Sequence, residues 1–379
     1  MGRLIAAVAL AAVGVLAAAP AHAETVGGAQ LSTAKRTVNP TESTDPLPDI
    51  WAATWVLADA ETGAVLAHKG AHVQRAPAST LKTLTALTVL PQTDPGQTYV
   101  ATSKAANIYG SKVGLKPGKT YTMDELWKAV FLPSANDAAI AVAQANGGVR
   151  KTVKQMNEVA RALGAYDTVA KNTNGLDAPG QLSSAYDLAL IARAGLERED
   201  FAGYARMVKA QFPNVKGKKS HTIYTTNRML LNGWKGAIGV KTGFTSNAGR
   251  TFVGAASRKG RTLIVSLMGI KESTDGAATK LLSWGFKNAD RVEPVGVLIE
   301  PPDAASIAVR SDDAAEDLTK EAESPTAASD DMALETTSTS GSAASVLPAG
   351  VVGVILVVAL GAGVLLVRRG TSRPGRHTN

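Results

Sequence analysis

The sequence predicts an α+β fold, in which an antiparallel sheet is flanked by helices and carries a helical subdomain, followed by a single C-terminal transmembrane helix. Strand patterns joined by short turns lie at both ends of residues 46–300, helical periodicity fills the middle, and a long uncharged segment lies near the C-terminus. Separate runs of strands and helices are typical of α+β domains, and strands joined by tight turns pair antiparallel.

The individual elements follow from local patterns. Residues 53–69 predict a hairpin that turns at Glu61-Thr62-Gly63, and residues 250–269 predict another that turns at Lys259-Gly260. A further strand is predicted over residues 237–245, directly before the second hairpin. Apolar residues at helical spacing predict helices over residues 123–131, 137–144, 149–163, 184–194 and 276–286.

The N-terminus has the pattern of an export signal. Arg3 precedes an apolar run from Leu4 to Ala19, and Ala21-His22-Ala23 matches a cleavage site. We therefore expect residues 1–23 to be a signal peptide, the alternative being an uncleaved anchor. Residues 24–45 are expected to be an exported polar segment ahead of a catalytic domain over residues 46–300.

The C-terminal part predicts a membrane anchor. Residues 301–345 carry ten acidic residues against two basic ones and few large apolar residues, which predicts a disordered linker. Residues 346–367 are expected to span the membrane, because the 21 uncharged residues from Leu347 to Val367 reach about 31 Å as a helix. The basic tail, residues 368–379, is then cytoplasmic by the positive-inside rule. The topology is single-pass type I, with the catalytic domain on the extracytoplasmic, cell-wall side.

The net charge of the chain and its expected location outside the membrane limit the classes of partner that it can bind. The chain has a formal charge of +8, and leaving out the linker, Arg3 and the four tail arginines gives about +11 for the body. A basic body outside a membrane suits anionic wall polymers. Nucleic acid is not expected as a partner, because the basic residues are scattered. The lysines at 216, 218 and 219 flank Gly217, which is typical of a hairpin tip.

Composition excludes several chemistries. The chain has no cysteine, so thiolate catalysis, disulfides and cysteine–zinc sites are excluded. A Ser-His-Asp triad would need His68, His72 or His221, and none has a matching motif. His68 and His72 are four apart, but a glycine lies between them in a predicted turn, so no metal site and no cofactor are expected. The chemistry that remains possible is a serine nucleophile activated by a lysine.

One S-x-x-K motif has a helical context. Ser79 and Lys82 begin an apolar-periodic run that Pro91 ends, so they share one face of the predicted helix, whose N-terminus favours an oxyanion near Ser79. A helix cap at Ser79 or Thr80 is the alternative for this motif alone. A second copy at Ser32 lies in a polar stretch, and we interpret it as a chance match.

Two further motifs follow in order. Ser134-Ala135-Asn136 precedes a predicted helix, so it is either a loop that points into a cleft or an N-cap. Lys241-Thr242-Gly243 lies on a predicted strand, whose edge could pair with an extended peptide while Lys241 and Thr242 hold a carboxylate. Lys82 can act as the base if burial and a neighbouring cation, for which Lys241 is the candidate, lower its pKa. The ordered set is the one found in penicillin-binding proteins and class A β-lactamases.

The surrounding sequence resembles the serine-type D-alanyl-D-alanine carboxypeptidases, the low-molecular-mass penicillin-binding proteins of the β-lactamase/DD-peptidase superfamily. The similar stretches include "RAPASTLKTLTAL", "FLPSANDAAIAVA", "NTNGLDAPGQLSSAYDLALIAR", "TNRMLL" and "GVKTGFTSNAGRTFVGAA". The resemblance implies a membrane-anchored enzyme that removes the terminal D-alanine of peptidoglycan stem peptides and is acylated by β-lactams.

The resemblance also implies a role for each motif residue. Ser79 would attack the D-Ala–D-Ala carbonyl, Lys82 would take the proton, and Ser134 would relay a proton to the leaving amine. The remaining residues would bind substrate. Asn136 would bind the substrate amide, and Lys241 and Thr242 of the K-T-G motif, with Gly243, would bind the carboxylate. The backbone N–H groups of Ser79 and Phe244 would bind the oxyanion. Arg228 matches an arginine near the carboxylate site, or is an ordinary surface arginine.

Some features depart from the family pattern. Several members carry a small β-domain and an amphipathic C-terminal helix, where this chain has an acidic linker and a span. Some carry another carboxylate-binding arginine after the last strand, where this chain offers only Lys271.

Three other functions remain open. A D,D-endopeptidase would use the same residues. A β-lactamase needs a deacylating glutamate in an E-x-x-L-N-like loop, which Glu158, Glu197 and Glu199 do not occupy. A catalytically silent wall-binding protein would be expected to lack a motif residue, and none is missing.

Overall fold

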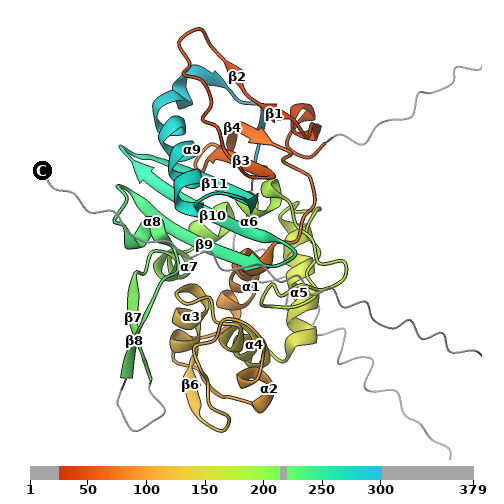
Figure 1. Ribbon diagram of the computed structural model, residues 1–379. Helices are drawn as coiled ribbons and strands as arrows, with labels where there is room; N and C mark the ends of the chain where they lie inside the picture. Colours follow the sequence, from red (N-terminus) through yellow and green to blue (C-terminus); the bar gives the residue numbers. More distant parts are fainter. Residues whose placement is uncertain (1–24, 214–219, 301–379) are drawn as a thin grey trace, which may run out of the picture. The chain divides into compact units, whose positions relative to one another are not determined.

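The computed structural model describes residues 25–213 and 220–300, all within the first of the chain's two compact units. Their centre is a seven-stranded antiparallel sheet with the order β1-β4-β3-β11-β10-β9, in which β13 also pairs with β4 (Figure 1). The sheet strands are β1 (Arg36–Thr37), β3 (Thr54–Asp59), β4 (Ala64–Lys69), β9 (Ala237–Thr245), β10 (Gly249–Arg258), β11 (Arg261–Ile270) and β13 (Gly296–Val297). The predicted mixed fold of helices and antiparallel sheet is confirmed.

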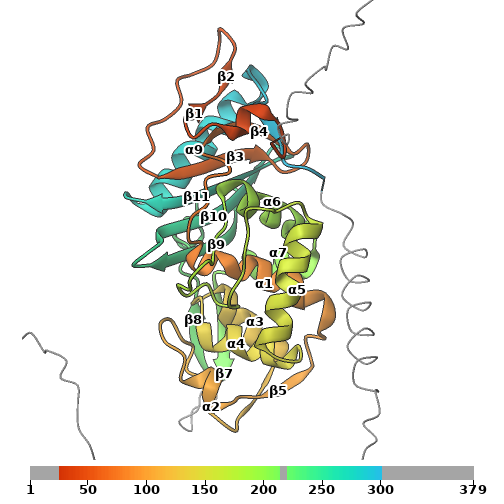
Figure 2. The ribbon, with the colours of Figure 1, turned by 90° about the vertical axis from the view of Figure 1, so that its right-hand side faces the viewer.

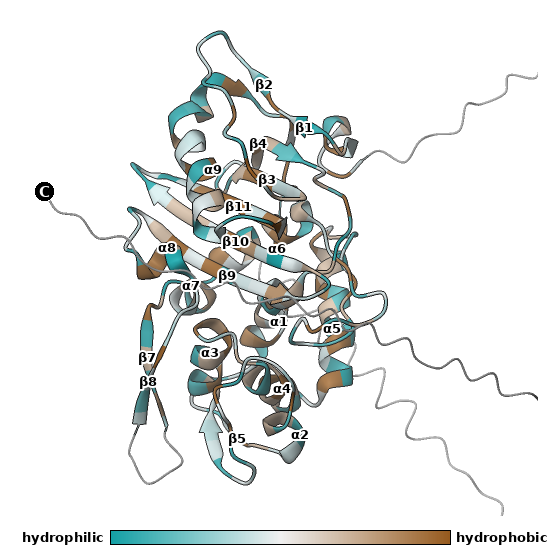
Figure 3. Ribbon diagram, viewed as in Figure 1, coloured by the Kyte–Doolittle hydropathy of each residue, from teal (hydrophilic) through white to brown (hydrophobic). Residues whose placement is uncertain are grey.

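Both faces of the sheet are covered, because alternate side chains of its strands enter two separate hydrophobic cores. Trp55 and Phe252 belong to the core under α8 (Arg228–Leu231) and α9 (Thr274–Asn288), whereas Val56 and Val253 belong to the core under α6 (Ala185–Leu196) and α1 (Lys82–Val89). Figure 3 shows apolar residues along the central strands and on the helices around them.

The helical subdomain lies beyond α1, on the side of the sheet away from α9 (Figure 2). Its helices are α2 (Ser103–Ala106), α3 (Met123–Phe131), α4 (Asn136–Ala145), α5 (Val149–Ala162) and α7 (Glu199–Ala205). The described residues also form three two-stranded antiparallel sheets, which pair β5 (Thr98–Val100) with β6 (Thr120–Thr122), β7 (Lys209–Pro213) with β8 (Ser220–Tyr224), and β2 (Asn39–Pro40) with β12 (Val292–Glu293). Helix α3 begins with a complete capping box between Thr122 and Glu125, which explains why its start agrees with the sequence pattern.

The segment that precedes the expected catalytic domain joins the fold. Leu31, in the 3₁₀ turn η1 (Ala29–Ser32), is fully buried, and β1 pairs with β4. The short polar stretch showed no apolar periodicity because one leucine and a two-residue strand are enough to attach it.

Several predictions lie outside the described residues: the signal peptide, the acidic linker, the transmembrane span, the basic tail and the lysine cluster. Among residues 25–213 and 220–300, no helix is both long and apolar enough to cross a membrane.

Candidate active site

A cavity of about 680 Å³ lies between β9 and the turn that carries Ser79. Six of the predicted site residues line it: Ser79, Ser134, Arg228, Thr242, Gly243 and Phe244. The other three, Lys82, Asn136 and Lys241, are at most 3% exposed. The three sequence motifs therefore meet at one place.

Ser79 lies on a 3₁₀ turn, η2 (Ala78–Leu81), and α1 starts only at Lys82. The sequence predicted one helix beginning at the serine, whereas the structure has a 3₁₀ turn there, before the α-helix begins. It keeps Ser79 and Lys82 on one face, as predicted, with Lys82 Nζ 2.8 Å from Ser79 Oγ. The second S-x-x-K motif has no such arrangement, because the Ser32 hydroxyl donates to the backbone carbonyl of Ala29.

Two close backbone approaches hold this turn. Gly175 has φ +80°, and a Cβ there would lie 1.9 Å from the carbonyl oxygen of Ala78. Gly243 of β9 packs against the serine itself, since a Cβ on it would lie 2.8 Å from the backbone nitrogen of Ser79. Only glycine satisfies these positions without moving the nucleophile.

Lys82 Nζ has three polar partners. It donates to Asn136 Oδ1 at 2.8 Å and to the backbone carbonyl of Asn174 at 2.6 Å, and it lies 2.8 Å from Ser79 Oγ. The Asn136 amide donates in turn to the carbonyl of Tyr109 at 2.8 Å, which fixes its orientation. The network leaves Lys82 one direction in which to exchange a proton, toward Ser79.

The electrostatics of the site favour a neutral Lys82. Burial lowers the pKa of Lys82 well below its ordinary value, and the nearby Lys241 lowers this pKa further, whereas Asp137 opposes the shift. Asp137 is fully buried and accepts hydrogen bonds from the backbone N–H groups of residues 113–115. Burial also lowers the pKa of Lys241 to about 7.

Ser134 has an unusual backbone and an unused hydroxyl. Its φ is +61°, in the left-handed region, and its buried Oγ has no hydrogen-bond partner among the described residues. Helix α4 begins only at Asn136, and no side chain in the described part of the chain caps its N-terminus. Such strain and such an unpaired group are often found at functional sites.

The cavity also carries cations around the K-T-G strand. Arg228 begins α8 and is exposed, and Arg250 and Lys271 line the same cavity. Thr242 Oγ1 lies 2.6 Å from Thr226 Oγ1. Sequence reasoning missed Arg250; only the hairpin register, which places it opposite Phe244, could have indicated it.

Other candidate residues lie elsewhere. His68, His72 and His221 are absent from the cavity wall, as are Glu158, Glu197 and Glu199. The acidic residues of that wall are Glu272 and Asp275, and Glu272 accepts hydrogen bonds from Lys280 and the backbone N–H of Trp51. This arrangement offers neither a histidine triad nor one of the three candidate deacylating glutamates.

Comparison with known families agrees with this geometry. Residues 39–272 match the model of peptidase family S11, described as D-alanyl-D-alanine carboxypeptidase. The chain belongs to this family of serine peptidases. The match extends from β2 to just before α9, so it includes all nine predicted site residues.

Relatives and solved structures extend the comparison. D-alanyl-D-alanine carboxypeptidase DacB2 of Mycobacterium tuberculosis is 41% identical over 249 residues, covering 64% of this chain and 84% of the relative. DacF of Bacillus subtilis is 33% identical, covering 61% of each chain. The crystal structure of a D-alanyl-D-alanine carboxypeptidase from Mycobacterium tuberculosis has a TM-score of 0.64 at 38% identity, covering 69% of this chain and all of that one. A mutant of Streptomyces K15 DD-transpeptidase has a TM-score of 0.61 at 28% identity, covering 63% of this chain and 99% of the other.

Proposed function

We propose that this chain is a membrane-anchored serine D-Ala-D-Ala carboxypeptidase that removes the terminal D-alanine of peptidoglycan stem peptides through an acyl-enzyme on Ser79, and that β-lactams acylate the same serine. The observation that carries the proposal is the hydrogen bond between Lys82 and Ser79 inside a buried, cationic site. Family membership supports the substrate class.

The hydrogen bonds of Lys82 suit a general base. A neutral amine has two N–H donors and one lone pair. Asn136 Oδ1 and the carbonyl of Asn174 are permanent acceptors, so they take the two donors and leave the lone pair facing the Ser79 hydroxyl. In the proposed step, Ser79 Oγ bonds to the carbonyl carbon and its proton passes to Lys82 Nζ.

Ser134 and the K-T-G strand complete the cycle. The peptide C–N bond breaks, and the Ser134 hydroxyl relays the proton to the leaving amine; it is available because no residue that the structure describes hydrogen-bonds to it. The backbone N–H groups of Ser79 and Phe244 would hold the oxyanion, and Asn136 would bind the substrate amide. Water then hydrolyses the ester and restores Ser79.

The cations would select a substrate that ends in a carboxylate. Lys241 and Thr242 would bind it, and Arg228, Arg250 and Lys271 would add to the positive potential of the cavity. Arg250 and Lys271 are our candidates for the function that a further arginine serves in some relatives.

We also propose that the protein is exported and anchored in the cytoplasmic membrane. The leader would export the body, and the span at residues 346–367 would hold it at the outer face of the cytoplasmic membrane, with the acidic linker as a tether.

The test uses the full-length protein in detergent with three substrates: a labelled penicillin, a pentapeptide ending in D-Ala-D-Ala, and a cross-linked peptide dimer. We expect covalent labelling and D-alanine release, both lost in Ser79→Ala. Faster cleavage of the dimer than of the pentapeptide would indicate a D,D-endopeptidase. Rapid turnover of penicillin would indicate a β-lactamase. Failure of both labelling and release would indicate a silent wall-binding protein.

A further inference from the structure

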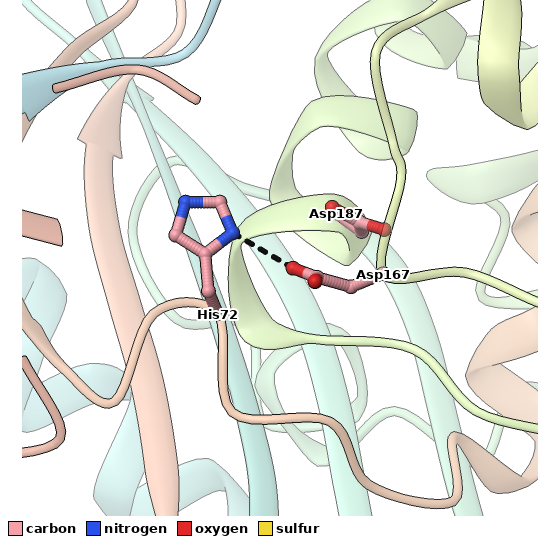
Figure 4. Close-up of side chains that lie close together, drawn as sticks. All are labelled: His72, Asp167 and Asp187. Atoms are coloured by element: carbon pink, nitrogen blue, oxygen red, sulfur yellow. Dashed lines mark hydrogen bonds and ion pairs between the residues drawn. The ribbon is translucent and has the colours of Figure 1, made fainter. Parts of the chain in front are cut away.

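A second polar cluster, outside the substrate cavity, is formed by His72, Asp167 and Asp187 (Figure 4). His72 follows β4, Asp167 lies in the loop after α5, and Asp187 is in the first turn of α6. His72 Nδ1 lies 2.7 Å from Asp167 Oδ2, and the imidazole ring packs on Tyr186 with centroids 4.5 Å apart. The sequence predicted no metal site at His68 and His72, and His68 takes no part in this cluster.

The spacing of the donor atoms fits a metal ion. One ligand atom from each of the three side chains lies within 4.8 Å of the other two. Ligands of one tetrahedral zinc ion lie ~3.4 Å apart, given bond lengths of about 2.0–2.2 Å. Small side-chain rotations therefore bring the three atoms into one coordination sphere. An imidazole with two carboxylates is a donor set used by zinc and related divalent transition metals.

Asp187 supplies an independent indication. Its side chain is 1% exposed, and its Oδ1 atom has no hydrogen-bond partner among the described residues. The other oxygen, Oδ2, accepts from Thr168 Oγ1 at 2.6 Å. Figure 4 shows the Asp187 carboxylate beside that of Asp167, with one oxygen on the side where His72 lies. A buried carboxylate oxygen without a partner is costly, and a cation would remove that cost.

The far side of the imidazole is arranged as in many metal-binding histidines. His72 Nε2 lies 3.0 Å from the backbone carbonyl oxygen of Val26. A carbonyl oxygen only accepts hydrogen bonds, so Nε2 carries a proton and Nδ1 is the nitrogen left for a ligand. The side chains of His72 and Asp167 are 18% and 23% exposed, so an ion can enter from solvent.

We propose that His72 Nδ1, Asp167 and Asp187 bind one divalent transition-metal ion of the zinc class, with water in the remaining position. The ion replaces the proton between His72 and Asp167. Because His72 also holds the carbonyl of Val26, the ion fixes the segment before η1 to α6. None of the three residues lines the Ser79 cavity, so the site is structural and does not depend on the proposed peptidase activity.

The test is a titration of metal-free, full-length protein in detergent with ZnCl₂ alone. We expect one tightly bound zinc per chain, a zinc-dependent rise in Tm, and visible d–d bands of a tetrahedral site when Co²⁺ is used. His72→Gln and Asp167→Asn should weaken binding at least tenfold, whereas the matched control His221→Gln, on β8, should bind like wild type. Both altered side chains of the cluster are partly exposed, so these variants are expected to fold.

Asp187→Asn adds a check on the buried group. In the absence of metal it should be as stable as wild type or more so, because it removes a buried carboxylate, yet zinc should no longer raise its Tm. Equal zinc affinity in wild type, His72→Gln and Asp167→Asn would overturn the proposal, as would an equal effect of Mg²⁺ and Zn²⁺ on the Tm of wild type.

Discussion

Lys241 adds to the effect of burial in lowering the pKa of Lys82, although the two lysines belong to different motifs and to different layers of the fold. Both side chains are 1% exposed. The positive charge of Lys241 disfavours the protonated form of the buried Lys82, and this favours a neutral base beside Ser79.

The first prediction concerns the pH dependence of acylation. Protonated Lys82 cannot accept the Ser79 proton, so the penicillin acylation rate should rise with pH as Lys82 deprotonates. Lys241→Met removes the cation that lowers the pKa of Lys82. The increase of the acylation rate with pH should therefore occur at higher pH in this variant, whatever its maximal rate. Stopped-flow acylation across pH measures this increase. Lys235→Met, an exposed lysine ahead of the same strand, is the control. If the acylation rate of Lys241→Met rises over the same pH range as that of wild type, Lys241 does not lower the pKa of Lys82.

The second prediction concerns stability. Burial lowers the pKa of Lys241 from 10.5 to about 7, so the unfolded chain binds more protons than the folded chain between those pH values. The folded state is therefore penalised at pH 7, and the penalty fades as pH rises toward 10.5. Lys241→Met should stabilise the protein at pH 7 by about 1–3 kcal/mol, or roughly 2–10 °C in Tm, while lowering but not abolishing the acylation rate.

Thermal unfolding of wild type and Lys241→Met at several pH values measures this effect. The Tm difference should shrink between pH 7 and pH 10. A difference that grows over this range, or a variant less stable than wild type at pH 7, would show that the charge of Lys241 is compensated in the folded protein.

A third prediction follows from Asn136. Asn136→Asp places a carboxylate against the Lys82 ammonium, which raises the pKa of Lys82, and it removes the donor to the Tyr109 carbonyl. Acylation at pH 7 should fall by about 10²-fold and recover in part at higher pH. Asn107→Asp, an exposed change after α2, should have no effect. An Asn136→Asp enzyme with unchanged rate would mean that Lys82 is not the base.

The fourth prediction separates a close contact from backbone strain. Gly175 and Gly180 have similar positive φ values of +80° and +71°, but a Cβ at Gly175 would overlap the Ala78 carbonyl, whereas at Gly180 it would meet only Lys171 Cε at 3.5 Å. Both alanine variants should lose about 1 kcal/mol from strain. Only Gly175→Ala should also slow acylation, because it displaces the turn that carries Ser79. Equal acylation rates in the two variants would show that the turn tolerates the shift.

Sequence reasoning predicted local features well because they depend on neighbouring residues. The K-T-G strand is β9 with the bounds expected, the first hairpin turns at Gly63, and Ser79 and Lys82 share a face. The S-x-x-K motif also predicted the contact between Ser79 and Lys82, since residues three apart on one helical face lie close together.

Features that depend on long-range packing were not predicted. Asn174 contacts Lys82 through its backbone carbonyl, a group that every residue carries, so the sequence offers no indication of it. Arg250 enters the cavity through strand register, and His72, Asp167 and Asp187 meet only because α6 packs against the loops around it. Gly175 and β9 lie against the 3₁₀ turn at Ser79, and these long-range contacts are not encoded in sequence periodicity.

The central claim is that Ser79 is the nucleophile, and mass spectrometry of the penicillin-treated full-length protein tests it most directly. We predict one penicilloyl group per chain, located on the peptide that contains Ser79, and no adduct in Ser79→Ala, while Ser32→Ala labels like wild type. An adduct on another residue, or labelling that persists in Ser79→Ala, would contradict the account.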